Sequence, residues 1–297
     1  MININDNSDL KNGGYSSYEN TINLPRHRWY YYKEGFSPNL VEKAIESSNI
    51  TKDDIILDPF NGSGTTTLSS SLNGYNSIGI EVNPFTAFLS KVKIKNIDMK
   101  SFIDSKQFIL DSVNNGGESS LKGYSTFSKT DKITKWLFND SILDSFAGGW
   151  LAAKKIASYN LKKMIKLVLI TSAMQNCNAT RDGKCLRYRD NWQKNEYNKD
   201  TFLSSLQTNL SIVSEDIKNF PIFKQPRILT GDTRSILKNN DIAKFKLCIT
   251  SPPYLNTFDY TDIYRPELFL GQFIKNNDEL IIFSLFKRVS YSMLISL

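Results

Sequence analysis

Two short stretches of this 297-residue sequence combine residue types that could do chemistry. The first, "DPFNGSGTT" at 58–66, follows an apolar segment and runs into a helix-like one. The second, "TSPPY" at 250–254, follows the apolar segment "KLCI". One offers a bare glycine turn and the other a rigid corner with a hydroxyl and an aromatic ring, so together they raise the question of what ligand needs both.

The glycine turn could bring a ligand close to the main chain. Gly62 and Gly64 can adopt backbone angles that other residues rarely adopt. The following helix would present free N–H groups and the positive end of its dipole, which suit a phosphate or a carboxylate. The turn lacks the Lys of a Walker loop and the GxGxxG spacing, but Glu81 follows about twenty residues later, where a ribose diol is often held. A tight strand-to-helix turn without a ligand is the alternative.

The second stretch could grip an amino group. Pro252 and Pro253 fix two φ angles and donate no N–H, so their carbonyl groups point in set directions. The Ser251 oxygen and a proline carbonyl could accept from one exocyclic NH₂ group, and Tyr254 could stack on a base. A strand-ending loop with a packed tyrosine is the alternative.

The elements that position these stretches alternate between strand and helix. We predict a strand at 53–58, a helix that ends near Gly74, a strand at 76–82 and a helix from Pro84. Ser37 and Pro38 are a typical N-cap and first helical residue. Strand patterns return in "RILTGD" and "KLCITSPPY", so the sequence predicts an α/β fold with a mostly parallel sheet.

A mainly helical insertion interrupts this pattern. We predict a flexible N-terminal arm at 1–22, a core at 23–96 and 226–297, and a helical insertion at 97–225. The insertion carries a polar, basic segment at 176–200, which we interpret as a loop.

Composition narrows the class of protein. A net charge of +7 and a pI near 9.1 favour an anionic partner such as nucleic acid. Three cysteines without a CxxC pair, and His27 as the single histidine, argue against a Cys/His zinc site, so we expect no metal. The N-terminus has no signal-peptide pattern, and no apolar run approaches the roughly 20 residues of a membrane span. We therefore expect a soluble, cytoplasmic protein.

The two stretches together resemble the DNA amino-methyltransferases, which transfer a methyl group from S-adenosylmethionine to an exocyclic nitrogen of a base. The resemblance also covers "GIEVNP", "TGD" and "TSPPYLNTFDYTDIYR". It implies a Rossmann-like sheet, S-adenosyl-L-methionine as cofactor and double-stranded DNA as partner.

The resemblance assigns roles by position. It implies that the turn holds the methionine part of the cofactor, that Glu81 holds the ribose and that Asp232 accepts from the adenine amino group. The cofactor-binding residues it implies are Phe36, Ser37, Asp58, Phe60, Gly62, Gly64, Thr65, Glu81, Asn83 and Asp232. The catalytic residues it implies, which would hold the flipped target base, are Ser251, Pro252, Pro253 and Tyr254.

The chemistry suits these residue types. The lone pair of a base amino group is delocalised into the ring, and two acceptors on its hydrogens can localise it, which is positioning and electrostatics rather than covalent catalysis. Relatives with Ser in the position of Ser251 mostly act on cytosine N4, so we favour cytosine N4. Adenine N6, an RNA base and a non-catalytic subunit that only binds DNA or cofactor remain alternatives.

A basic and aromatic segment in the insertion predicts DNA contact. It interleaves cationic side chains with Tyr188 and Trp192, a composition that suits phosphates and bases. The predicted DNA-binding residues are Arg181, Lys184, Arg187 and Arg189. A solvated loop, balanced by Asp182 and Asp190, is the alternative.

The C-terminal part departs from the family pattern. Enzymes of this kind have further strands after "TSPPY", yet the 43 remaining residues read as helical. We therefore expect a truncated or split methyltransferase, whose incomplete sheet a partner chain could complete. A restriction–modification or phage system, with a cognate restriction endonuclease, is the expected context.

Overall fold

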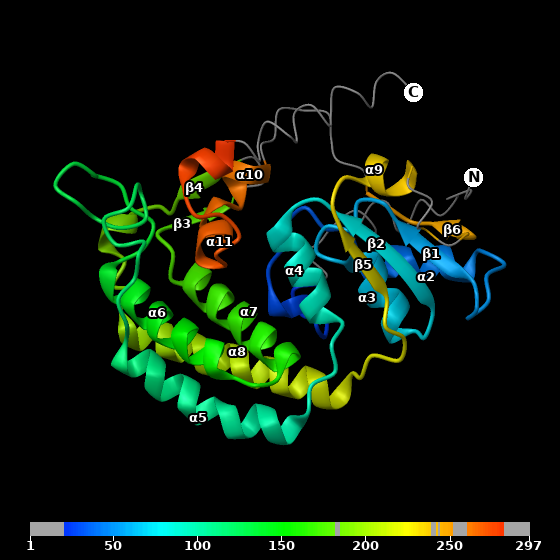
Figure 1. Cartoon of the computed structure of the whole chain (residues 1–297), viewed down its shortest axis with the longest axis horizontal. Coiled ribbons are helices and arrows are strands. Elements are labelled where there is room, and N and C mark those ends of the chain that lie inside the picture. Colours follow the sequence, from blue (N-terminus) through cyan, green and yellow to red (C-terminus); the bar gives the residue numbers. More distant parts are fainter. Residues whose placement is uncertain (1–20, 182–184, 239–241, 243, 252–259, 282–297) are drawn as a thin grey trace. The chain divides into compact units, whose positions relative to one another are not determined.

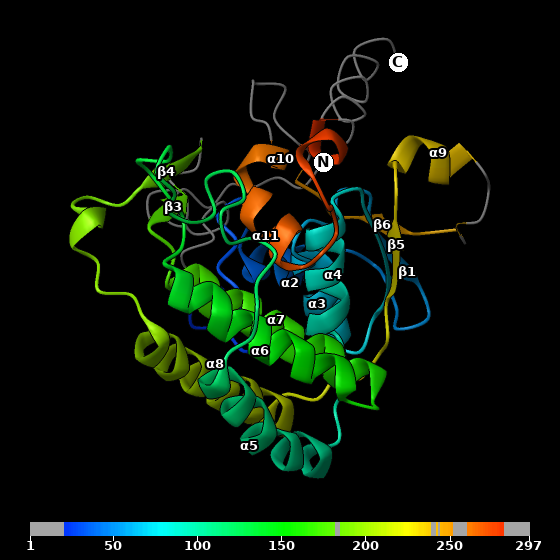
Figure 2. The same cartoon turned by 60° about the vertical axis from the view of Figure 1, so that its left-hand side comes forward.

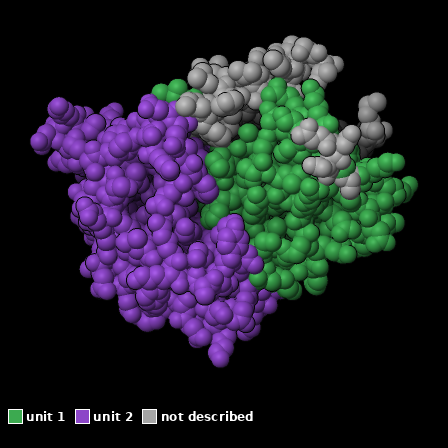
Figure 3. All heavy atoms as spheres, viewed as in Figure 1, with its two compact units in different colours: residues 1–96, 220–258, 281–297 green, residues 97–219, 259–280 purple. Residues whose placement is uncertain are grey.

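The computed structural model describes residues 21–181, 185–238, 242, 244–251 and 260–281. The chain divides into two compact units (Figure 3). Unit 1 comprises Met1–Asn96, Phe220–Phe258 and Ile281–Leu297, and unit 2 comprises Ile97–Asn219 and Asp259–Leu280. The predicted flexible arm, 1–22, lies outside the described residues except for its last two positions.

Unit 1 is built on a parallel sheet (Figure 1). Its strands are β1 (Ile55–Asp58), β2 (Asn76–Glu81), β5 (Arg227–Thr230) and β6 (Leu247–Cys248). They lie in the order β5-β2-β1-β6, and all three pairings are parallel. The predicted α/β, Rossmann-like fold is confirmed, and each strand falls within the segment that the sequence predicts for it.

The described helices of unit 1 are α2 (Pro38–Glu46), α3 (Thr65–Leu72), α4 (Pro84–Lys93) and α9 (Thr233–Lys238), with a short 3-10 helix, η2 (His27–Trp29). Two of them, α2 and α4, begin at the predicted residues Pro38 and Pro84. Ser37 caps α2 by accepting a hydrogen bond from the Asn39 amide, and Asn83 caps α4 in the same way through the Phe85 amide. Helix α3 packs against β1 and β2, and α4 packs against β2 and β5.

The core of unit 1 joins segments that are far apart in the sequence. One cluster of buried side chains contains Phe36 and Val41 from the start of the unit, Ile56 from β1 and Ile249 from the end of β6. Each fully buried apolar side chain of this size contributes about 1.5–3 kcal/mol. This burial holds the segment that leads to Ser251 beside β1.

Arg26 holds together the two places in unit 1 where the helical insertion begins and ends. Its fully buried guanidinium donates to the carbonyl oxygens of Lys93 and Lys95 and to that of Phe220, at 2.7, 3.0 and 2.8 Å. It also donates to the Asn96 side chain at 3.2 Å. A buried guanidinium requires such acceptors, so these bonds hold residues 93–96 and 220 together within unit 1.

Unit 2 is mainly helical. Its long helices are α5 (Met99–Asn115), α6 (Asp140–Lys155), α7 (Tyr159–Gln175) and α8 (Lys199–Asn219). Helices α5 and α7 each pack against both α6 and α8 (Figures 1 and 2). Two short helices, α10 (Tyr260–Ile263) and α11 (Arg265–Leu270), also belong to this unit, and α11 packs against α7.

The basic segment of unit 2 differs from the predicted loop. It contains an antiparallel hairpin of β3 (Ala179–Arg181) and β4 (Leu186–Tyr188), followed by the 3-10 helix η3 (Trp192–Lys194). The Asp-Gly dipeptide at 182–183 is a typical hairpin turn signal, although these residues lie outside the described ones. Over the described residues, no helix is both long and apolar enough to cross a membrane.

Candidate functional site

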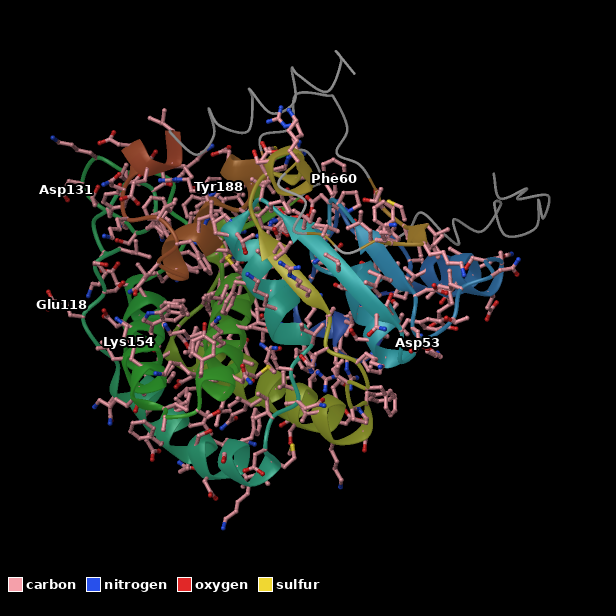
Figure 4. The ribbon with its side chains drawn as sticks, turned by 45° about the vertical axis from the view of Figure 1, so that its right-hand side comes forward. Asp53, Phe60, Glu118, Asp131, Lys154 and Tyr188 are labelled. Carbon is pink, nitrogen blue, oxygen red and sulfur yellow. The ribbon has the colours of Figure 1, made fainter. Side chains whose placement is uncertain are left out.

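The glycine turn lies at the carboxyl end of β1, between Asp58 and the first residue of α3. Gly62 and Gly64 both have positive φ angles, +49° and +88°. A Cβ on Gly64 would lie 2.8 Å from the Ser90 side chain, so this position requires glycine for space as well as for backbone angle. Figure 4 labels Phe60 in this turn and Asp53 before the opposite end of β1.

Glycine in the neighbouring strand lets the turn fold down onto the sheet. A Cβ on Gly79 would lie 2.5 Å from the Asn61 side chain, so Asn61 packs where a larger residue of β2 would stand. The Asn61 amide donates to the Ile80 carbonyl at 2.9 Å, and the Asn61 side-chain oxygen accepts from the Thr67 hydroxyl at 2.9 Å. The turn is thereby held to both β2 and α3.

Glu81 braces the turn from the end of β2. Its carboxylate accepts from the Gly62 amide at 2.8 Å and from the Asn83 amide at 2.7 Å. A carboxylate can accept about four hydrogen bonds, so these two leave capacity for a ligand. Glu81 therefore both shapes the turn and presents acceptor sites beside it.

Asp58 is the buried acid of the site. Its Oδ1 accepts from the Thr250 hydroxyl at 2.7 Å and from the Phe60 amide at 3.1 Å. Its Oδ2 is buried and has no hydrogen-bond partner among the residues that the structure describes. Burial raises the pKa of Asp58 to about 6, although the hydroxyl groups of Thr250 and Thr66 and the Phe60 amide lower it, and the nearby Glu81 charge raises it further.

The start of the second stretch, at Thr250 and Ser251, follows a residue that is bound to β1 and α3. The Ile249 amide donates to the Leu57 carbonyl at 3.0 Å, and the Thr66 hydroxyl of α3 donates to the Ile249 carbonyl at 3.2 Å. Ser251 is half-buried immediately after this anchor. Pro252, Pro253 and Tyr254 lie outside the described residues. The carboxyl ends of β1 and β6 are thus neighbours, at the point where the strand order reverses and open α/β sheets bind ligands.

Asp232 follows β5 and has a partner that the sequence did not suggest. The Arg234 guanidinium donates to both of its carboxylate oxygens, at 2.6 and 3.1 Å, and both side chains are about 30% exposed. The Gly231 amide donates to the Glu81 carbonyl at 3.0 Å, which places Asp232 beside the end of β2. An adenine amino group at Asp232 would share the carboxylate with Arg234.

Phe36 and Ser37 have structural duties in this fold. Phe36 lies in the core cluster with Ile56 and Ile249, and the fully buried Ser37 caps α2. Their neighbour Tyr32 lies beside the turn: a Cβ on Gly62 would be 3.5 Å from its ring. The aromatic run "HRWYYY" is the sequence signal for Tyr32, although its three tyrosines could not be ranked without the structure.

Lys93 is a buried amine beneath the turn that the sequence did not single out. Its Nζ lies 3.5 Å from the Ser63 carbonyl, and burial lowers the pKa of Lys93 to about 7. Burial, with a smaller effect of Lys93, also lowers the pKa of His27 to about 3. The turn therefore rests on a polar interior rather than on apolar side chains alone.

The predicted DNA-binding residues differ in their exposure and in their partners. Arg187 is exposed at the centre of β4, whereas the half-buried Arg189 donates to the Cys177 carbonyl at 2.9 Å. Lys184 lies outside the described residues. Arg181 forms a buried ion pair with Glu267 and stacks over Tyr264, 4.4 Å from the ring centroid, so its charge is directed into unit 2 rather than towards solvent.

Comparison with known proteins is consistent with this arrangement. Residues 3–91 match a DNA methylase family model. The chain is 31% identical over 300 residues to the type II methyltransferase M.BsoBI of Geobacillus stearothermophilus, covering 91% of this chain and 57% of that protein. It is 24% identical to the type II methyltransferase M.AvaI of a Nostoc species, covering 86% of this chain and 55% of that protein. The chain thus spans little more than half the length of these relatives. No solved structure matches it.

The raised pKa of Asp58 predicts a pH-dependent stability. Because the folded protein holds this proton more tightly than the unfolded chain, the contribution is fully present below about pH 4 and is lost as pH rises through about 6. Asp58→Asn removes this titration. We compare the free energies of unfolding of variant and parent by urea denaturation. The difference, variant minus parent, should therefore increase by about 2–3 kcal/mol from pH 4 to pH 7.5. Asp53→Asn, at an exposed site, is the control, and a pH-independent difference for Asp58→Asn would contradict the assignment.

Replacing each of the two arginines of the hairpin should change the stability of the protein by a different amount. Arg181→Ala removes the cation that pairs with the buried Glu267 carboxylate, so we expect a loss of about 3–5 kcal/mol in the free energy of unfolding. Arg187→Ala changes an exposed residue and should stay within about 0.5 kcal/mol of the parent. Urea denaturation of both variants tests this, and equal effects would show that Arg181 does not support unit 2.

Proposed function

Because the chain belongs to the DNA N4/N6 amino-methyltransferase family, we propose that it transfers a methyl group from S-adenosylmethionine to an exocyclic amino group of a base in DNA. We favour cytosine N4 as the acceptor, since Ser251 opens the "SPPY" tetrapeptide, and adenine N6 is the alternative. The type II names of the relatives favour a restriction–modification system, with a cognate endonuclease as partner and a reaction in the cytoplasm.

One observation carries this proposal: the hydrogen bond from the Thr250 hydroxyl to Asp58 Oδ1, at 2.7 Å. It joins the start of the glycine turn to the residue directly before Ser251. A methyl donor and an acceptor base must meet within contact distance, so their two binding segments must share one edge of the sheet. The adjacent ends of β1 and β6 provide such an edge.

The residues around the turn fit the cofactor. The buried Asp58 Oδ2, which has no hydrogen-bond partner in the described part of the chain, suits a cationic amino group such as that of the methionine part. The amino end of α3 suits a carboxylate, and the remaining acceptor capacity of Glu81 suits the ribose hydroxyls. When bound, the cofactor supplies an electrophilic methyl group on a sulfonium.

The protein's own contribution is to position the base and its amino group. The Ser251 oxygen and a carbonyl of the proline pair would accept the two amino hydrogens, which localises the nitrogen lone pair. Tyr254 would stack on the flipped base, a contact worth about 1–3 kcal/mol, which offsets the few kcal/mol that flipping costs. Serine is no strong base, so we assign Ser251 an orienting role.

Unit 2 offers a surface for DNA. Arg187 is exposed on β4, the Lys135 ammonium lies 5.8 Å from the Tyr188 ring centroid, and Lys129 lies 5.4 Å from that of Trp136. Both lysines are exposed, and the rings are half-buried. Cations beside aromatic faces suit phosphates and bases, so we propose that this insertion contacts the duplex.

A non-catalytic subunit is the second candidate. The chain spans 57% of the M.BsoBI relative, so a partner chain could be needed for a complete sheet and for turnover. Such a subunit would bind cofactor and DNA without transferring the methyl group.

Methyl transfer is the direct test. The full chain is incubated with unmethylated DNA and labelled S-adenosylmethionine, and the nucleosides are identified by mass spectrometry. We expect N4-methylcytosine, and a loss of about 100-fold in kcat for Ser251→Ala, because one positioned acceptor is removed. Ser71→Ala is the control, since the buried Ser71 hydroxyl donates only to the Thr67 carbonyl of its own helix.

The product decides between the candidates. N6-methyladenine would move the proposal to the alternative base. Cofactor and DNA binding without any incorporation would favour the non-catalytic subunit.

DNA affinity tests the surface on unit 2. We expect Arg187→Ala and Lys135→Ala each to weaken binding of a DNA duplex several-fold, because each removes a cation from the proposed phosphate contact. The slope of log affinity against log salt concentration should fall by about 0.9 for each phosphate that the variant no longer neutralises. Lys100→Ala, an exposed lysine at the start of α5, is the control. Unchanged affinity and slope in both variants would place the DNA contact elsewhere.

A further inference from the structure

Four lysines gather on α6 and α7 of unit 2. Lys154 lies in the last turn of α6, and Lys162, Lys163 and Lys166 lie on α7 (Figure 4 labels Lys154). Partial burial, together with the charges of the other three lysines, lowers the pKa of Lys166. The four ammonium groups are therefore close enough to repel one another, and we call them the α6–α7 lysine cluster.

No carboxylate balances the α6–α7 lysine cluster in the part of the chain that the structure describes. There, none of its four ammonium groups forms an ion pair or a hydrogen bond. The sequence accounts for this, because between Asp144 and Asp182 it contains five lysines and no acidic residue. The positive charge of the cluster is therefore left to solvent or to an anionic partner.

The positions of these charges do not favour the fold. Lys162 and Lys163 lie at the first turn of α7, which contains no acidic residue and where the positive end of the helix dipole disfavours cations. Lys162 and Lys166 are four residues apart on one helix, a spacing at which like charges destabilise it. Helix stability therefore does not explain the cluster, whereas binding of an anion would relieve the repulsion.

Aromatic rings hold two of the four lysines in place. The Lys166 ammonium lies 4.2 Å from the ring centroid of the buried Trp150, and that of Lys163 lies 4.1 Å from the ring centroid of Tyr159. Tyr159 is 65% exposed, so this cation and its ring are presented at the surface. Side chains that are already held lose less freedom when they bind a ligand, which suits a phosphate-binding surface.

The α6–α7 lysine cluster is separate from the surface proposed above, which contains Lys129, Lys135 and Arg187. Lys135 precedes α6, whereas Lys154 lies in its last turn, and the 16 residues of this helix span about 24 Å. The cluster thus adds positive charge at the opposite end of α6.

We propose that the α6–α7 lysine cluster is a second DNA-binding surface of unit 2, which binds backbone phosphates without reading the sequence. This inference rests on the proposed function, because it takes duplex DNA as the anionic partner. The lysine ammonium is a flexible point charge that suits phosphate oxygens, and phosphate contacts position a protein on the duplex without carrying sequence information.

Binding of a fluorescently labelled duplex to the full chain, at several salt concentrations, tests this surface. The cluster variant combines Lys154→Gln, Lys162→Gln and Lys163→Gln and keeps Lys166, which packs on Trp150. We expect its affinity to fall about tenfold or more at about 0.1 M salt. The slope of log affinity against log salt concentration should fall by about 0.9 for each lost phosphate contact, and by up to about 2.7 in all. The loss should be the same for duplexes of different sequence.

A matched control removes the same charge elsewhere. It combines Lys52→Gln, Lys224→Gln and Lys246→Gln, three exposed residues that precede β1, β5 and β6. They lie at the amino ends of these parallel strands, opposite the proposed site, so the control should bind DNA within about twofold of the parent. An equal loss in the control would show that only net charge matters and would overturn the inference.

The other outcomes separate the inference from the function on which it rests. Unchanged affinity and slope in the cluster variant, with methyl transfer retained, would overturn the second surface and leave the proposed function standing. Absence of DNA binding by the parent would overturn both. Labelled polyglutamate is the competing probe: if the cluster variant lost only this probe and kept its DNA affinity, the cluster would belong to an acidic polypeptide instead.

Thermal stability without DNA checks the premise that the cluster lysines repel one another. The cluster variant should have a higher Tm than the parent at low salt, and added salt should reduce this gain, because it screens exposed charges. The control should show no such gain, since Lys246 pairs with Asp54. A lower Tm of the cluster variant at low salt would show that these lysines stabilise the fold and would contradict the inference.

Discussion

The proposed site depends on one buried carboxyl group. Asp58 ends β1, accepts from Thr250 across 192 residues of sequence and accepts from the Phe60 amide inside the glycine turn. A buried carboxyl without such donors would be costly, so its position constrains both segments that supply them. Asp58 Oδ2 has no hydrogen-bond partner among the described residues, so the proposed cofactor would supply the remaining donor.

Several residues serve the fold and the proposed chemistry at once. Glu81 holds the Gly62 amide while keeping acceptor capacity, and Ser37 caps a helix close to the turn. Asp232 engages Arg234 at the end of the adjacent strand. Such shared duties restrict side-chain motion, and a pre-organised site has less conformational freedom to lose when a ligand binds.

The two units use buried arginines for different purposes. In unit 1, Arg26 binds the carbonyl groups at which the chain leaves and returns. In unit 2, Arg181 pairs with Glu267 and thereby ties the β3–β4 hairpin to α11. Because an isolated buried charge is costly, each arginine makes its segments interdependent. Some of the positive charge of the chain is therefore engaged inside the protein and is not available to bind DNA.

The four strands of unit 1 and its helices α2, α3 and α4 could be predicted from the sequence, because periodicity and cap residues are local: Ser37, Gly74 and Pro84 mark boundaries with no tertiary information. The resemblance also indicated Asp58 and Ser251 as parts of one site. Three further facts required the folded chain: Thr250 joins these two residues, Arg234 engages Asp232, and Arg181 is buried while Arg187 is exposed. They depend on strand order and on packing between distant segments, and residue types alone carry no record of which distant partner a side chain meets.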